Sequence, residues 1–186
     1  MIKRSDLKKD MYVRMSDTLN NDSFWSRLMK GRYFQIDIPA TEPDDATCYG
    51  PCYGSIIMYG MNYVEQAFNN DMEPITSEEQ EKLSYVFKNQ NEFKGLFKLG
   101  EKIYRHIGNI EDLLNEVGVY GLNLWEISDT KNFIEQLKEE ICLNDSNANL
   151  SEYEDELEEL EEMFNRLISM LDNLSALEDK YIRRVK

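Results

Sequence analysis

The C-terminal part of the chain carries an unbroken heptad pattern of apolar residues, which constrains the fold more than any other feature of the sequence. From Leu150 to Leu174 the apolar positions are separated alternately by three and four residues. They are Leu150, Tyr153, Leu157, Leu160, Phe164, Leu167, Leu171 and Leu174. Such spacing keeps the side chains on one face of an α-helix. The sequence therefore predicts a long terminal helix whose apolar face is buried.

Acidic residues crowd the start of the same helix. The stretch SEYEDELEELEE, residues 151–162, contains eight acids and neither Lys nor Arg. The acids are Glu152, Glu154, Asp155, Glu156, Glu158, Glu159, Glu161 and Glu162. Residues 139–162 have a net charge of −11, so the other 162 residues account for −4 of the total of −15. Residues 1–32 have the opposite sign, with a net charge of +4.

Two interpretations of this acidic run are open. On a helix it would rise about 16 Å with roughly one charge per 2 Å, and duplex DNA carries about one per 1.7 Å. The run can therefore imitate a nucleic acid in a basic protein groove. The same charges can instead form a solvated face on a leucine-rich helix. In both cases the acidic half would repel phosphates, so we expect it not to bind nucleic acid directly.

The charges also bear on self-association through the heptad. In a parallel homodimer, Glu156 would face Glu161 of the partner helix, and no Lys or Arg is nearby to offset the repulsion. We therefore expect a monomer. Pairing with a different coiled coil remains the alternative use of this helix.

The first third of the sequence has the composition of β-strands. We expect strands over residues 11–15, 31–38 and 54–64, which are rich in β-branched and aromatic residues. In the second of them, Phe34, Ile36 and Ile38 alternate with Tyr33, Gln35 and Asp37, as on a half-buried strand. A long loop with three prolines and two cysteines precedes the last strand.

After Pro74 the apolar residues recur at the spacing of an α-helix. Thr76 and Glu79 have the spacing of a capping box, which predicts a helix start. Apolar residues then continue at helical spacing to Val117, with an interruption at Gly108-Asn109 where we expect one helix to end and another to begin. A further helix is predicted over residues 129–143. The fold class is thus α+β, with a β module in residues 1–72 and a helical domain in residues 73–186.

The cysteines suggest no metal site. Cys48 and Cys52 are four residues apart, and the remaining zinc ligands would have to be Cys142 and His106, which lie far along the chain. We expect free thiols, no metal and no cofactor. The neighbouring tyrosines, Tyr49, Tyr53, Tyr59 and Tyr63, can form either an exposed contact patch or part of the sheet packing. An odd cysteine count and the lack of a signal-like or membrane-length apolar run predict a cytoplasmic protein.

Catalytic patterns are missing as well. The single histidine, His106, stands beside Arg105 with no motif around it, so no Ser-His-Asp or Cys-His arrangement is indicated. The helix after Gly108 carries acids and no base, which is unsuited to entering a DNA groove. We therefore predict no catalytic residues and a non-enzymatic protein.

One resemblance concerns the N-terminal third. The segments MYVRMSDTLNNDSFWSRLMKGRYFQID and GSIIMYGMNYVEQAF place a Met-x-Val-Arg strand before a Gly-Arg strand. This arrangement resembles the small SH3-like β modules of Gram-positive phage and mobile-element proteins, although the long Cys-containing loop departs from it. The chain as a whole is similar in character to phage-encoded inhibitors of bacterial defence, anti-CRISPR proteins among them. The resemblance transfers no site residues.

These observations predict a non-enzymatic inhibitor in the host bacterial cytosol. Its acidic row, residues 152–162, is expected to occupy the basic nucleic-acid channel of a protein partner, with a CRISPR-type nuclease as the partner that the resemblance implies. The alternative is a phage structural or assembly protein that pairs through the heptad helix. No membrane partner is expected.

Overall fold

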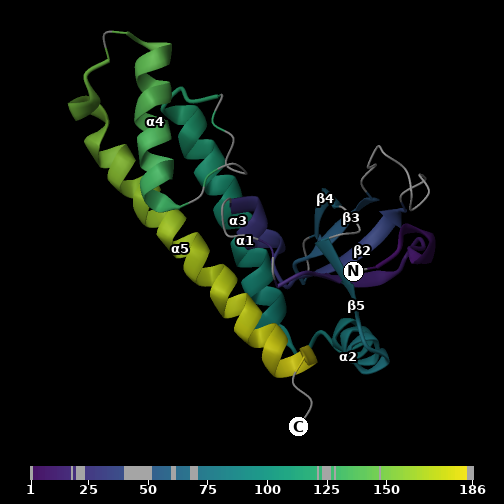
Figure 1. Cartoon of the computed structure of the whole chain (residues 1–186). Helices are drawn as coiled ribbons and strands as arrows, with labels where there is room; N and C mark the ends of the chain where they lie inside the picture. Colours follow the sequence, from purple (N-terminus) through teal and green to yellow (C-terminus); the bar gives the residue numbers. More distant parts are fainter. Residues whose placement is uncertain are drawn as a thin grey trace. The chain divides into compact units, whose positions relative to one another are not determined.

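The computed structural model confirms the α+β class (Figure 1). It describes residues 2–17, 19, 24–39, 52–59, 62–67, 71–120, 122, 127, 129–146 and 148–183. In this part of the chain a small antiparallel sheet lies within residues 12–74, and the long helix Glu154–Glu178 lies near the C-terminus. Most of the predicted loop, including Cys48 and Tyr49, lies outside the described residues.

The sheet consists of five strands in the described residues, in the order β4-β3-β2-β1-β5. The strands are β1 (Tyr12–Met15), β2 (Tyr33–Ile38), β3 (Cys52–Ile57), β4 (Asn62–Ala67) and β5 (Met72–Pro74). All neighbours pair antiparallel, with Val13 opposite Phe34 and Phe34 opposite Ile56. These three side chains are buried, so the register brings apolar residues of adjacent strands together.

Two strand expectations are corrected by this pairing. The alternation places Ile38 on the buried face of β2 and Tyr33 on the exposed face, but the Ile38 side chain is 54% exposed and that of Tyr33 is buried. The register of β2 against β3 shifts between Ile36 and Ile38, and such an irregularity turns the following side chain to the other face. The expected single strand over residues 54–64 is in fact the end of β3 and the start of β4. Tyr59 interrupts it, because its φ of 48° is incompatible with an extended strand.

The predicted capping box is confirmed at helix α2 (Ser77–Lys88). The Thr76 hydroxyl accepts from the Glu79 backbone N–H at 3.1 Å, and the Glu79 carboxylate accepts from the Thr76 N–H at 2.9 Å. The free carboxylate oxygen of Glu79 accepts a hydrogen bond from the Tyr33 hydroxyl at 3.2 Å. Glu79, which caps the start of α2, therefore also connects this helix to Tyr33 of the sheet.

The expected break at Gly108-Asn109 is wrong, because α3 (Lys94–Glu116) runs through it as one helix. Ile103, Ile107, Ile110 and Leu114 form a continuous buried face across the glycine. A glycine costs a helix only about 1 kcal/mol relative to alanine, and burial of this face outweighs that cost. The helix ends instead before Gly118, whose φ of 76° suits a helix terminus.

Replacing Gly108 by alanine is expected to stabilise the protein by about 0.5–1 kcal/mol. A Cβ built at Gly108 meets no atom within 4 Å, so the gain in helix propensity carries no steric cost. Urea unfolding followed by circular dichroism measures the change. Gly118→Ala is the matched control and should destabilise the protein, because alanine is strained at its positive φ. A destabilised Gly108→Ala variant would contradict the continuous helix.

Two further helices, α4 and α5, run side by side (Figure 1). Helix α4 (Thr130–Asn144) is capped by the Asp129 carboxylate, which accepts from the Asn132 N–H at 2.9 Å. The chain then forms a 3-10 turn (Leu150–Tyr153), α5 (Glu154–Glu178) and a π-helical turn (Asp179–Arg183). Phe133 of α4 stacks on Phe164 of α5 with the ring centroids 4.7 Å apart. The predicted terminal helix is therefore packed along α4.

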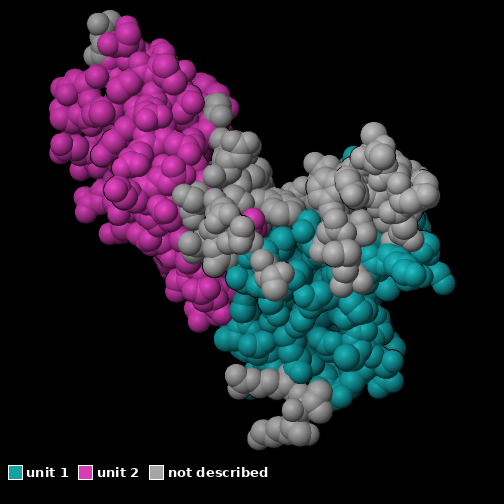
Figure 2. All heavy atoms as spheres, in the orientation of Figure 1, with its two compact units in different colours: residues 1–19, 29–101, 174–186 teal, residues 20–28, 102–173 magenta. Residues whose placement is uncertain are grey.

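The chain divides into two compact units, coloured separately in Figure 2. Unit 1 consists of Met1–Leu19, Met29–Glu101 and Leu174–Lys186, and unit 2 consists of Asn20–Leu28 and Lys102–Asn173. The units do not follow the sequence boundary expected between residues 72 and 73. Unit 1 contains the sheet and the end of α5, and unit 2 contains α4 and most of α3 and α5. Short helix α1 (Phe24–Met29) precedes β2.

Candidate functional site

The acidic row is the first candidate site, and we define it as the eight acids from Glu152 to Glu162. All of its side chains are exposed except that of Glu156, which is half-buried. The row begins in the 3-10 turn and continues through the first turns of α5. Acids at the start of a helix interact favourably with its dipole, so the helix itself stabilises the row.

The solvent-facing arrangement of the row follows from the heptad. Leu157, Leu160 and Phe164 are buried, and at helical spacing they occupy one side of α5. The exposed acids fill the positions between them and therefore share the opposite side. Within the part of the chain that the structure describes, none of these carboxylates forms an ion pair. The row thus presents uncompensated negative charge over several helical turns.

The heptad face is covered within the chain itself. Its buried members are Leu157, Leu160, Phe164, Leu167, Leu171 and Leu174. Leu150 and Tyr153, at the start, are half-buried. A partner coiled coil could reach the buried residues only if they first left their present contacts, which would expose a large apolar surface.

Three of the four possible zinc ligands, Cys52, Cys142 and His106, lie among the described residues. His106 is half-buried, and its Nε2 lies 2.8 Å from the Met163 carbonyl oxygen, so it links α3 to α5 in unit 2. Cys52 is a buried free thiol of β3, and Cys142 is an exposed free thiol of α4. Cys48 lies outside the described residues. Among the described residues, no group of three or more His, Cys, Asp or Glu side chains could hold a metal ion.

Of the tyrosines flanking the cysteines, two have described side chains. Tyr53 is exposed on β3, and Tyr59 is fully buried. Tyr49 and the side chain of Tyr63 lie outside the description. The exposed Tyr53 therefore fits the contact-patch interpretation, and the buried Tyr59 fits the packing interpretation.

A buried charge cluster in unit 1 was not anticipated from the sequence. The Glu178 carboxylate is 0% exposed and accepts hydrogen bonds from Arg32 Nη1 at 2.7 Å, Arg183 Nη2 at 2.9 Å and the Tyr59 hydroxyl at 3.0 Å. Arg32 is 1% exposed and also donates to Ser175 Oγ at 3.0 Å. These contacts join the end of α5 to the residues flanking β2 and β3.

The cluster is close to electrically neutral. Arg183 also pairs with Asp179 at 3.0 Å and donates to the Gly31 carbonyl oxygen. The two arginines and two carboxylates therefore balance, which is the condition for burying such groups at a tolerable cost. A sequence signal for the cluster does exist. Glu178 falls seven residues after Leu171, on an apolar position of the heptad, where an acid requires a buried partner.

Two tyrosines in or beside this cluster predict a loss of stability at alkaline pH. Burial, followed by the charge of Glu178, raises the pKa of the Tyr59 phenol well above its ordinary value. Burial and the charge of Glu79 raise the pKa of the Tyr33 phenol. The unfolded chain therefore releases these protons at lower pH than the folded chain. The stability they contribute is complete below about pH 10 and falls above it by about 1.4 kcal/mol per pH unit for each phenol.

Urea unfolding at a series of pH values from about 8 to 11 tests this expectation. Tyr59→Phe removes one of the two protons, so its stability should fall less steeply with pH than that of the parent chain. Equal slopes for the two proteins would show that the Tyr59 phenol does not keep its proton in the folded state.

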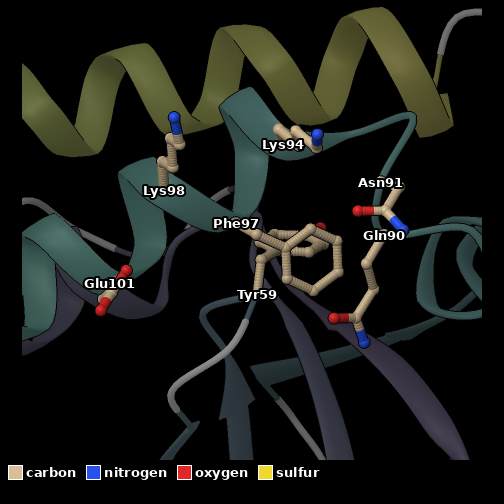
Figure 3. Close-up of a pocket in the computed structure, with 7 residues that line it drawn as sticks. All are labelled: Tyr59, Gln90, Asn91, Lys94, Phe97, Lys98 and Glu101. Carbon is tan, nitrogen blue, oxygen red and sulfur yellow. The ribbon is translucent and has the colours of Figure 1, made fainter.

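A pocket of about 340 Å³ in unit 1 lies beside the same tyrosine (Figure 3). Tyr59 and Phe97 meet edge to face with centroids 5.9 Å apart, and the rest of the lining comes from Gln90, Asn91, Lys94, Lys98 and Glu101. A Cβ at Gly100 would lie 1.7 Å from the Met58 carbonyl oxygen. The close approach of α3 to the backbone before Tyr59 therefore depends on this glycine.

Comparison with known proteins adds no assignment to these sites. No family model, curated protein or solved structure matches the chain. The likeness to phage inhibitors and to SH3-like modules consequently stays a prediction. Among the helices that the structure describes, none is both long enough and apolar enough to cross a membrane.

Proposed function

We propose that this chain is a non-enzymatic binding protein whose acidic row occupies a basic nucleic-acid-binding groove of a protein partner. The observation that carries the proposal is the exposed, unpaired state of the row among the described residues. Bound in this way, the chain excludes nucleic acid and acts as an inhibitor. The partner class suggested by its character is a CRISPR-type nuclease in the cytosol of a bacterial host.

Electrostatics supports a nucleic-acid mimic over an ordinary contact surface. A carboxylate row of similar linear charge density to DNA also attracts cations from solution, and a basic groove that binds it releases those cations as it does when it binds DNA. The helix keeps the carboxylates in a fixed row, so little conformational entropy is lost on binding. The packed side of α5 supplies this rigidity, since its buried residues are anchored within the chain.

Capture from a bacterial lysate on the immobilised chain tests the proposal. We expect the captured proteins to bind nucleic acid, to be displaced by added duplex DNA, and to elute with moderate salt. For six to ten charge contacts, affinity should fall by about 10³–10⁵ between 50 and 200 mM salt. A captured partner that holds DNA and the chain together, or whose affinity does not change with salt, would refute the mimic.

The second candidate function is assembly through the heptad helix. Burial of Leu157 to Leu174 within the chain makes this the weaker proposal, because pairing would require those residues to unpack. Size-exclusion chromatography with light scattering separates the two candidates. A monomer at low micromolar concentration agrees with the mimic, and a stable homodimer favours assembly.

A further inference from the structure

Three aromatic side chains in unit 1 form a cage with walls at right angles. Tyr85 comes from α2, Phe93 from the turn before α3, and Tyr181 from the π-helical turn that follows α5. The Phe93 ring meets Tyr85 at 88° with centroids 6.0 Å apart, and it meets Tyr181 at 83° with centroids 5.2 Å apart. The Phe93 ring is therefore nearly perpendicular to both tyrosine rings.

The aromatic cage borders a pocket of about 300 Å³, whose lining also includes Glu81, Lys82 and Val86. Tyr85 is 51% exposed, and Phe93 and Tyr181 are half-buried. The Tyr85 hydroxyl donates to the Glu92 carboxylate at 3.0 Å, which orients this exposed ring. A ligand can thus reach aromatic faces that are already held in place.

The charges around the cage favour a cation. Aromatic faces attract cations through their negative quadrupole, most strongly where several rings surround the charge. Lys82, which lines the pocket, is engaged by Glu78 at 2.9 Å. Glu81 is exposed and, within the described residues, makes no ion pair. The pocket therefore combines three rings with a carboxylate for which the described part of the chain supplies no ion-pair partner.

The chain itself already places a cation on one of these rings. Lys180 Nζ lies 5.0 Å from the centroid of the Tyr181 ring. Lys180 does not line the pocket, so the pocket can accept a group from another molecule.

We propose that the aromatic cage binds the guanidinium group of an arginine side chain on a protein partner. A guanidinium is planar and weakly hydrated, so it stacks on aromatic rings at a lower desolvation cost than a primary ammonium. It also carries N–H donors for the Glu81 carboxylate, which a quaternary ammonium lacks. The proposal goes beyond the acidic row and does not depend on it, because the row belongs to unit 2.

Aromatic NMR spectra of the full chain, titrated with Nα-acetyl-arginine methylamide, test the proposal. The signals of Tyr85, Phe93 and Tyr181 should shift together, with a dissociation constant on the order of 1–10 mM. The matching lysine and trimethyllysine compounds should bind several-fold more weakly. No shift of the three rings up to about 50 mM arginine compound would overturn the proposal. Tighter binding of trimethyllysine would overturn the choice of guanidinium.

Variants separate the cage from general charge attraction. Tyr85→Ala should weaken arginine binding about fivefold, and Tyr85→Phe, which keeps the ring but loses the hydrogen bond to Glu92, should weaken it less. Glu81→Gln should weaken binding of the arginine compound about threefold, and it should weaken trimethyllysine less because that group has no N–H donor for the carboxylate. Tyr120→Ala, at a tyrosine that is 80% exposed, is the control and should have no effect. An unchanged affinity in Tyr85→Ala would refute the aromatic cage, whatever the outcome for the acidic row.

Discussion

Glu178→Gln is expected to lower the free energy of unfolding by about 3–5 kcal/mol, because it breaks the buried ion pair between Arg32 and Glu178, whose atoms lie 2.7 Å apart. The substitution keeps the shape of the side chain and removes only its charge. Arg32 is 1% exposed, so water cannot replace the lost carboxylate without local opening. Arg183 would keep Asp179 as a partner, and the damage should therefore centre on Arg32. Urea unfolding at neutral pH measures the loss.

Two further variants show whether the broken ion pair causes that loss. In the double variant Arg32→Met with Glu178→Leu, both members of the pair are replaced by apolar groups, and part of the stability should return. The return should be incomplete, because the buried Tyr59 hydroxyl loses its acceptor on Glu178. Asp172→Asn removes an exposed charge from the same helix and should change stability by less than about 0.5 kcal/mol. A loss below about 1 kcal/mol in Glu178→Gln would contradict the view that this cluster holds the end of α5 in unit 1.

The second large effect is expected at the acidic row. Replacing Glu154, Glu158 and Glu161 by lysine should weaken binding to the proposed partner on the order of a hundredfold or more, because three attractive contacts become repulsive. All three side chains are exposed, so no packing contact is lost. Competition with labelled duplex DNA for the captured partner measures the affinity, and circular dichroism verifies that the helix is retained.

Net charge alone must be excluded as the cause of such a loss. Glu111, Asp112 and Glu116 are exposed acids of α3 in the same unit, and their replacement by lysine changes the total charge by the same amount. This control should keep most of the affinity. If both triple variants lose binding equally, long-range charge is responsible, and if neither does, the acidic row is not the binding site.

Local patterns in the sequence predicted most of the helical elements. The capping box at Thr76 and Glu79 fixed the start of α2 because both residues act within one helical turn. The heptad predicted the long terminal helix, and its buried residues lie on the predicted face. The same local reasoning failed at Gly108, where a weak propensity penalty was treated as a break although the buried face continues through it.

The candidate sites were predictable to very different degrees. Exposure of most of the acidic row agrees with the positions that the heptad leaves outside, so the row could be located from the sequence. The aromatic cage could not, since Tyr85 and Phe93 are close in sequence but Tyr181 joins them from the far end of the chain. The two sites therefore differ in whether periodicity alone brings their residues together.

By itself, the sequence determined the α+β class, the capping box of α2, the terminal helix and the concentration of charge on its first turns. These features depend on residues within a few positions of one another, where backbone geometry sets the spacing. Only the tertiary structure decided that Glu178 meets Arg32, 146 residues away, and that β3 and β4 form separate paired strands. Such contacts depend on how the whole chain closes on itself, and no local period encodes which distant residue will supply a buried acid with its counter-charge.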